Sequence, residues 1–229
     1  MRGADHKHMT GEDTARISHQ ERLLGRRLYL LLTRSLCTQD PIWTLGEALR
    51  GGVQLVQIRE KPFEPDALPW CRELVRICAE HEVPVFINDR IDLVEPSGAF
   101  GVHLGQEDLD AFTPIDFRKR SFALGISTHD DAERARALEF GADCLGAGPC
   151  FATATKGYSE PNDRDWLRRS FAASAPPCYA IGGITAQNLP QLQDLGARAI
   201  AVSSVILQSD QPREVAEILR SELDAVDPS

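Results

Sequence analysis

The feature that most constrains the fold is the alternation of short apolar runs with helical stretches along nearly the whole chain. Eight runs are rich in aliphatic or β-branched residues, and each is short enough to be one strand. They are residues 28–33, 53–60, 83–89, 101–105, 122–128, 143–149, 178–183 and 199–204. Apolar residues recur with helical spacing in most of the intervening segments, for example in residues 65–82.

Eight strand–helix units in about 200 residues predict an α/β protein with a (β/α)₈ barrel, the TIM-barrel architecture, as a single domain. The structural alternative is an open doubly wound sheet, but the glycine-rich dinucleotide fingerprint G-x-G-x-x-G is missing after the first run. We expect the barrel to cover residues 28–226. Residues 1–27 are polar and charged, without the apolar core of a secretory signal, and predict a flexible tail.

Composition narrows the classes of partner. The net charge of −9 argues against general binding of nucleic acid or of an anionic membrane surface. No apolar run approaches the roughly 18 residues of a membrane span. The six cysteines form no C-x-x-C pair, which predicts reduced thiols in a cytoplasmic protein. The sequence leaves open whether the chain forms a homo-oligomer.

The end of the second expected strand carries a polar cluster. In a barrel of this kind the site lies at the carboxyl ends of the strands. Alternation places Gln57, Arg59 and Lys61 on one side of the strand and Glu60 on the other. Two cations and an amide suit a phosphate or a diphosphate. A solvated strand end that pairs with Glu60 is an equally good interpretation of these residues alone.

Two aspartates follow neighbouring strands. Asp89 comes directly after Asn88 at the end of the third expected strand, and Asp108 follows the fourth. Two carboxylates that face a diphosphate can hold Mg²⁺, with water completing the coordination. The alternative, of similar weight on spacing alone, is that both residues cap helices.

The fifth expected strand ends in Ser127, Thr128 and His129. These residues could form an N-cap cluster for the helix that begins near Asp130, or His129 could act as an acid or base. Spacing alone leaves the role of His129 open.

A second anion site is expected after the seventh and eighth strands, where barrels frequently bind phosphate through backbone N–H groups. Gly183 follows the seventh strand, and Ser203 and Ser204 follow the eighth. Two anion sites on one cavity imply two phosphorylated substrates, or one substrate with phosphate at both ends. No Cys–His or Ser–His–Asp arrangement is evident from order or spacing, so the chemistry predicted is displacement of diphosphate.

The run Gly148–Tyr158, "GPCFATATKGY", follows the sixth strand and places Thr153, Thr155 and Lys156 just beyond its end. In the expected barrel this run lies between the two anion sites. Its hydroxyls and its cation can therefore face both ligands.

Taken in order, these motifs resemble the thiamine phosphate synthase (thiamine-phosphate pyrophosphorylase) family. The matching runs are "QIREK", "INDRIDL", "GVHLGQEDL", "LGISTH", "GADCLGAGPCFATATK", "AIGGI" and "AVSS", and the resemblance spans about Leu28 to Leu219. It implies a transferase of thiamine biosynthesis that joins 4-amino-2-methyl-5-hydroxymethylpyrimidine diphosphate to 4-methyl-5-(2-phosphoethyl)thiazole, with Mg²⁺ required. The products are thiamine phosphate and diphosphate, formed through a pyrimidine carbocation.

The resemblance also implies a role for each matching position. The pyrimidine diphosphate would be held by Gln57, Arg59, Lys61, Asn88, Ser127 and Lys156, of which Lys156, Ser127 and Arg59 are the expected catalytic residues. The thiazole phosphate would be held by Thr153, Thr155, Gly183, Ser203 and Ser204, and the metal by Asp89 and Asp108.

Two alternatives share the resemblance. TenI-like thiazole tautomerases have the same barrel and phosphate loop, and they use a histidine near the fifth strand. The presence of Asp89, Asp108 and Lys156 favours the synthase, while His129 leaves a tautomerase activity open. The other alternative is a non-catalytic barrel that binds thiamine phosphates as a regulator. Cys150 departs from the branched aliphatic residue common in the family, which we expect to alter packing only.

Overall fold

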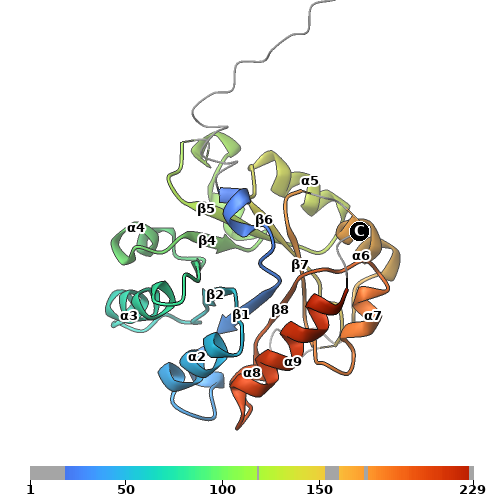
Figure 1. Cartoon of the computed structure of the whole chain (residues 1–229). Helices are drawn as coiled ribbons and strands as arrows, with labels where there is room; N and C mark the ends of the chain where they lie inside the picture. Colours follow the sequence, from blue (N-terminus) through green and yellow to red (C-terminus); the bar gives the residue numbers. More distant parts are fainter. Residues whose placement is uncertain (1–18, 118, 153–159, 173–174, 227–229) are drawn as a thin grey trace, which may run out of the picture.

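The chain closes into a barrel of eight parallel strands, as the alternation of apolar runs predicts. The computed structural model describes residues 19–117, 119–152, 160–172 and 175–226. The strands pair in sequence order, and the ring is closed by the first and the last (Figure 1). They are β1 (Leu28–Leu32), β2 (Leu55–Ile58), β3 (Val85–Asn88), β4 (Gly101–Leu104), β5 (Ala123–Thr128), β6 (Cys144–Ala147), β7 (Cys178–Ile181) and β8 (Ile200–Val202).

Helices surround the barrel and cover its outer face. They are α2 (Pro41–Arg50), α3 (Ala67–Ala79), α4 (Val94–Ser97), α5 (Asp131–Glu139), α6 (Arg164–Ala172), α7 (Leu189–Gln193), α8 (Ser204–Leu207) and α9 (Pro212–Ala225). Four 3₁₀ turns join them in the described residues: η1 (Arg34–Leu36), η2 (Ile91–Leu93), η3 (Asp108–Ala111) and η4 (Pro114–Phe117). The sequence did not predict α4, α8 or these turns, because segments of three or four residues are too short to show a period.

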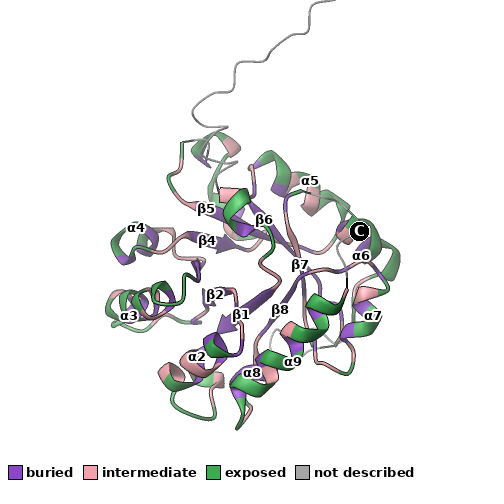
Figure 2. Ribbon diagram, in the orientation of Figure 1, coloured by how far each residue is buried: buried purple, intermediate pink, exposed green. Residues whose placement is uncertain are grey.

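Residues of β1 illustrate how the pleat divides the core. Leu28, Leu30 and Leu32 belong to the apolar cluster beneath the helices, while Tyr29 and Leu31 belong to the cluster inside the barrel. Both faces of a barrel strand are buried, so the strand is continuously apolar rather than alternating with polar residues. Figure 2 shows the result: the strands are buried, and the helices expose only their outer faces.

The end of the barrel opposite the carboxyl ends of the strands is closed by the segment before β1. Residues 19–23 form a helical turn, drawn in blue in Figure 1, and Leu23 is 1% exposed. Arg22 lies over the ring of Phe100, 4.4 Å from its centroid, and Gln20 donates to the carbonyl oxygen of Ala142. The part of the chain that packs on the barrel therefore begins upstream of Leu28, the expected boundary.

A buried ion pair reinforces this closed end. Arg120 donates to Oδ2 of Asp143 at 2.8 Å, and the backbone N–H of Leu124 donates to the same oxygen at 2.8 Å. The side chain of Asp143 is fully buried and that of Arg120 is 8% exposed.

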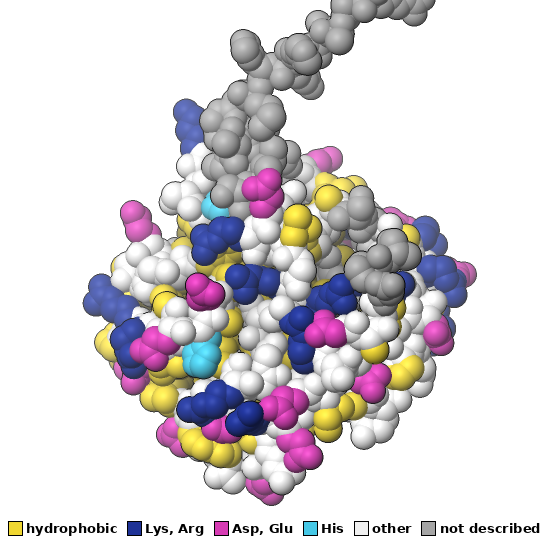
Figure 3. Space-filling model, in the orientation of Figure 1, with side chains coloured by type: hydrophobic (Ala, Val, Ile, Leu, Met, Phe, Trp, Pro, Cys, Tyr) yellow, Lys and Arg dark blue, Asp and Glu magenta, His cyan; other side chains and the backbone are white. Residues whose placement is uncertain are grey.

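The charged side chains visible on the face drawn in Figure 3 are of both signs and intermingle.

Two further expectations concern the whole chain. All six cysteines are free in the structure. Among the described residues, no helix combines the length and the apolar character needed to cross a membrane.

Candidate active site

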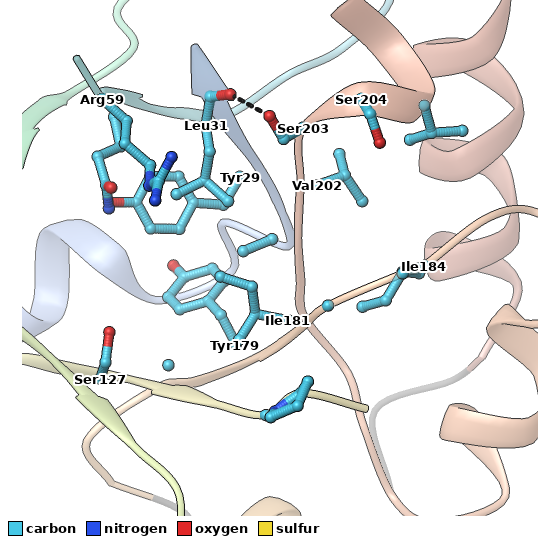
Figure 4. A pocket seen from close by; sticks show the side chains of 18 of the residues that line it. Tyr29, Leu31, Arg59, Ser127, Tyr179, Ile181, Ile184, Val202, Ser203 and Ser204 are labelled. Carbon is cyan, nitrogen blue, oxygen red and sulfur yellow. Dashed lines mark hydrogen bonds between the residues drawn. The ribbon is translucent and has the colours of Figure 1, made fainter. Parts of the chain in front are cut away.

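The carboxyl ends of the strands surround a cavity of about 260 Å³. Figure 4 shows its walls: Arg59 and Ser127 lie on one side, Ser203 and Ser204 on the other, and the rings of Tyr29 and Tyr179 between them. The cavity is lined by residues from every part of the barrel rim, among them Gln57, Asn88, His103, His129, Gly182, Gly183 and Thr185.

Aromatic rings from β1 and β7 form the floor of this cavity. The rings of Tyr29 and Tyr179 meet edge to face with centroids 5.2 Å apart. Gln57 donates its amide N–H to the hydroxyl of Tyr29 at 3.0 Å, and both residues are buried. Within the described part of the chain, the hydroxyl of Tyr179 and the amide nitrogen of Asn88 are buried without a hydrogen-bond partner. Both residues line the cavity, but these two atoms have no accessible surface in it, so a ligand would reach them only after a neighbouring side chain moves.

Arg59 supplies the positive charge of the cavity. Burial lowers the pKa of its guanidinium, and the negative charge of Asp89 opposes that shift. No carboxylate of the described residues makes an ion pair with it, whereas the neighbouring Glu60 faces away and lies 3.4 Å from Arg34. The alternative in which the strand end pairs with Glu60 is therefore wrong. A half-buried cation without a counter-ion is the arrangement expected of an anion site.

The two aspartates lie together at the rim. Lys61 Nζ is 2.9 Å from Asp89 Oδ2. Asp108 Oδ2 accepts from the backbone N–H of Gly105 at 2.9 Å. Burial raises the pKa of Asp108, and the negative charge of Asp89 raises it further, against the effect of the Gly105 hydrogen bond.

This pair fits a magnesium ion, because two hard oxygen donors repel each other until a cation joins them. No cluster of three or more His, Cys, Asp or Glu side chains with metal-binding geometry occurs among the described residues.

Asp89 has an unusual backbone conformation, which among the described residues other than glycine it shares with Glu82. Its φ angle is +61°, in the left-handed region that few residues other than glycine adopt. Strained backbone of this kind is concentrated at functional sites. Neither aspartate is the N-cap of the adjacent 3₁₀ turn, since Arg90 and Glu107 occupy those positions. The structure thus does not support the helix-capping alternative.

The end of β5 is part of the site rather than a cap. Ser127 and Thr128 belong to the strand, and the N-cap of α5 is Asp130, which accepts from the backbone N–H of Glu133. His129 lines the cavity, and its Nδ1 lies 2.7 Å from Glu133 Oε2. Residues 127–129 are therefore not the N-cap itself, although the backbone N–H of His129 donates to Glu133 in the first turn of α5.

The loops after β7 and β8 form the opposite wall. Gly182 and Gly183 have φ angles of +103° and +63°, which favour glycine. A Cβ on Gly183 would lie 2.6 Å from the carbonyl oxygen of Ala152, so the two loops approach too closely for a side chain. Ser203 donates to the carbonyl oxygen of Leu31 at 2.9 Å, which ties the β8 end to β1 (Figure 4). The first N–H groups of α8, which begins at Ser204, have no upstream carbonyl in helical register.

The structure brings most of the expected site residues to one place. Seven line the cavity: Gln57, Arg59, Asn88, Ser127, Gly183, Ser203 and Ser204. Lys61, Asp89 and Asp108 form the adjoining group at the rim. Thr153, Thr155 and Lys156 lie outside the described residues.

Several residues that line the cavity were not predicted as site residues, and three of them have polar ring side chains. Tyr29, His103 and Tyr179 lie in the middle of apolar runs, where they count as core. Their alternation along the strands could have shown that they point into the barrel. A polar side chain at such a position needs a hydrogen-bond partner or a ligand.

Comparisons with known proteins agree with this geometry. The model of the thiamine monophosphate synthase family matches residues 28–206. A thiamine-phosphate synthase of Thermus thermophilus is 40% identical over 214 residues, which cover 88% of this chain and 98% of that protein. The thiamine phosphate pyrophosphorylase of Pyrococcus furiosus, a solved structure, has a TM-score of 0.76 and 28% identity, covering 90% of this chain and 98% of that one.

Some relatives are longer. A thiamine-phosphate synthase of Synechococcus sp. (strain WH7803) is 41% identical over 173 residues, 75% of this chain. The match covers 49% of that protein, and for a Synechocystis relative it covers 60%. The chain thus spans about half to three fifths of the length of these cyanobacterial relatives. The region matched by the family model, residues 28–206, contains every cavity residue named above, and we conclude that the chain belongs to the thiamine monophosphate synthase family.

Proposed function

We propose that the protein is a thiamine phosphate synthase. It would condense 4-amino-2-methyl-5-hydroxymethylpyrimidine diphosphate with 4-methyl-5-(2-phosphoethyl)thiazole, giving thiamine phosphate and diphosphate. The observation that carries the proposal is the half-buried Arg59, which faces the cavity without an ion-pair partner among the described residues. Membership of the family supports these substrates for the anion site.

The diphosphate side of the cavity would bind the leaving group. Arg59 would donate to its oxygens, with Asn88 and Ser127 beside it. Lys61 now neutralises Asp89, and it would turn to the diphosphate when a metal takes its place. Asp89 and Asp108 would hold Mg²⁺, which when bound neutralises charge on the departing diphosphate.

The opposite wall would bind the thiazole phosphate. Gly183, Ser203 and Ser204 offer backbone N–H groups, and Ser204 also a hydroxyl, to a single phosphate. Thr153 and Thr155 would lie near the thiazole, and Lys156 would meet the diphosphate.

The reaction would be a dissociative displacement. The bond between the pyrimidine methylene carbon and the diphosphate oxygen breaks, and its electron pair leaves with the oxygen. The thiazole nitrogen then donates its lone pair to the methylene cation. The protein contributes the position of both ligands, the charge opposite the leaving group and a cavity that limits water.

An assay with both substrates tests the proposal. Diphosphate should be released only when both substrates and Mg²⁺ are present, and EDTA should stop the release. Asp89→Asn should lower the rate strongly with the fold intact. Asp92→Asn is the matched control, because Asp92 lies three residues away, 62% exposed and paired with Arg90. A folded protein that shows no turnover would refute the proposal. Binding of the substrates without formation of product would indicate a regulatory barrel.

A second candidate is a thiazole tautomerase. It is favoured by the contact between His129 and Glu133, a carboxylate that can orient an imidazole base at the cavity wall. This activity needs one substrate and no metal. Tautomerase activity should survive Asp108→Asn and disappear in His129→Asn. Synthase activity, by contrast, should be lost in Asp108→Asn.

We also propose a cytoplasmic location. All six cysteines are free, and four of them are buried. A reducing compartment keeps such thiols unpaired. Fractionation of cells that produce the full chain would test this.

A further inference from the structure

A buried histidine inside the barrel contacts one of the proposed catalytic residues. His103 points inward from β4, is 7% exposed and lines the cavity. Its Nε2 lies 3.1 Å from Oγ of Ser127 on β5, within hydrogen-bonding distance. The mechanism above gives His103 no part.

The chain makes room for this imidazole on the two strands that follow. Gly125 lies opposite His103 in the β4–β5 register. A Cβ on Gly125 would lie 2.4 Å from His103 Nδ1, so no larger residue fits without moving the ring. A Cβ on Gly146 of β6 would be 3.7 Å from the same ring. On the remaining side lies Tyr29, whose ring centroid is 6.4 Å away. These neighbours fix the ring where it meets Ser127.

The direction of the hydrogen bond decides what Ser127 can do. A hydroxyl has one proton. If Ser127 donates it to His103, its oxygen can only accept from a ligand. If His103 donates from Nε2, the hydroxyl proton of Ser127 is available for an anionic oxygen. A diphosphate carries acceptors only, so the second arrangement is the one that serves it.

We propose that His103 is a positioning residue for the synthase reaction. In its neutral Nε2–H form it donates to Ser127 and so aims the hydroxyl proton of Ser127 at the diphosphate. This inference rests on the proposed function and extends it to a residue that does not itself touch the diphosphate.

Substitution of His103 and Ser127 together tests the coupling. Full-length protein carrying His103→Leu, His103→Gln or Ser127→Ala, and each His103 variant combined with Ser127→Ala, would be assayed with both substrates. His103→Leu should lower kcat/KM about 10- to 100-fold, as expected for a hydrogen bond to a charged group. In the Ser127→Ala background the same change should have little further effect, because there is no hydroxyl left to orient. His81→Leu, on an exposed loop, is the matched control.

The glutamine variant separates positioning from other roles. A glutamine amide can donate near the place of Nε2 but cannot act as a base, so His103→Gln should recover most of the activity. Loss of activity in this variant with the fold retained would overturn the proposal and favour His103 as a base that activates Ser127. Additive effects in the double variants would also overturn it.

If His103→Leu does not fold, a measurement on the wild-type protein that does not depend on activity still tests the proposal. Nitrogen-15 NMR of the wild-type protein distinguishes the two imidazole tautomers, and His103 should carry its proton on Nε2. A proton on Nδ1 alone would overturn the proposal. Absence of turnover in the wild type would instead refute the proposed function, so the two failures are distinguishable.

Discussion

Replacing Arg59 with methionine tests the anion site directly, because it removes the cation and keeps an unbranched side chain. The guanidinium faces the cavity, is half-buried and has no ion-pair partner among the described residues. A diphosphate oxygen would be its first full counter-ion. One hydrogen bond to a charged group contributes about 1.5–3 kcal/mol, so the variant should bind diphosphate about 10- to 150-fold more weakly.

Calorimetry with inorganic diphosphate and Mg²⁺ measures this affinity, and urea denaturation of the same samples measures the free energy of unfolding. Stability should stay the same or rise, because an uncompensated half-buried charge disappears. Arg76→Met is the control: Arg76 lies on the outer face of α3, is 65% exposed and pairs with Glu80. Both its affinity and its stability should match the wild type.

Two results would refute this reasoning. An affinity within twofold of the wild type would show that diphosphate does not contact Arg59. A loss of stability larger than about 1 kcal/mol would show that the guanidinium supports the fold through contacts comparable to ordinary hydrogen bonds.

Three further predictions concern other parts of the molecule. Asp143→Ala should destabilise the protein by about 3–5 kcal/mol, because it leaves Arg120 buried without its ion-pair partner, whereas Glu217→Ala, at the exposed ion pair with Arg213, should cost less than about 1 kcal/mol; equal losses in urea denaturation would contradict this. Gly183→Ala should raise KM for the thiazole phosphate, because a left-handed φ costs alanine about 1–2 kcal/mol and the loop must move, and KM for the pyrimidine diphosphate should change little; unchanged values for both would show that the loop does not bind phosphate. Burial raises the pKa of Cys150 to about 12, so at pH 8 its thiolate is scarce and alkylation should be roughly 1,000-fold slower in the native than in the unfolded protein, as followed by peptide mass spectrometry; similar rates would contradict its burial.

The barrel was predictable because strand and helix periods dominate its sequence, but the ends of the strands were not. The apolar run at residues 199–204 predicts a strand of six residues, while β8 ends at Val202. Ser203 leaves the ladder because its hydroxyl bonds to Leu31, and Ser204 begins α8. The type of residue does not change where the strand hydrogen bonds stop. The sequence pattern therefore indicates the end of a strand less well than its middle.

The site was predictable where a residue follows a strand directly. Alternation along β2 places Arg59 in the cavity, but the strand ends at Ile58 and no longer determines the direction of Lys61, which reaches Asp89 at the rim. The contact between His103 and Ser127 depends on the register of β4 against β5. A single sequence does not contain this register, so the contact between His103 and Ser127 could not be predicted.

The closed end of the barrel has a consequence for the passage of ligands. Leu23, Tyr29, Phe86 and Tyr179 are all at most 1% exposed and fill the interior below the cavity. Ligands must therefore enter and leave the cavity at the carboxyl ends of the strands. A ligand bound at this rim therefore lies between the solvent and the tyrosine rings at the floor of the cavity.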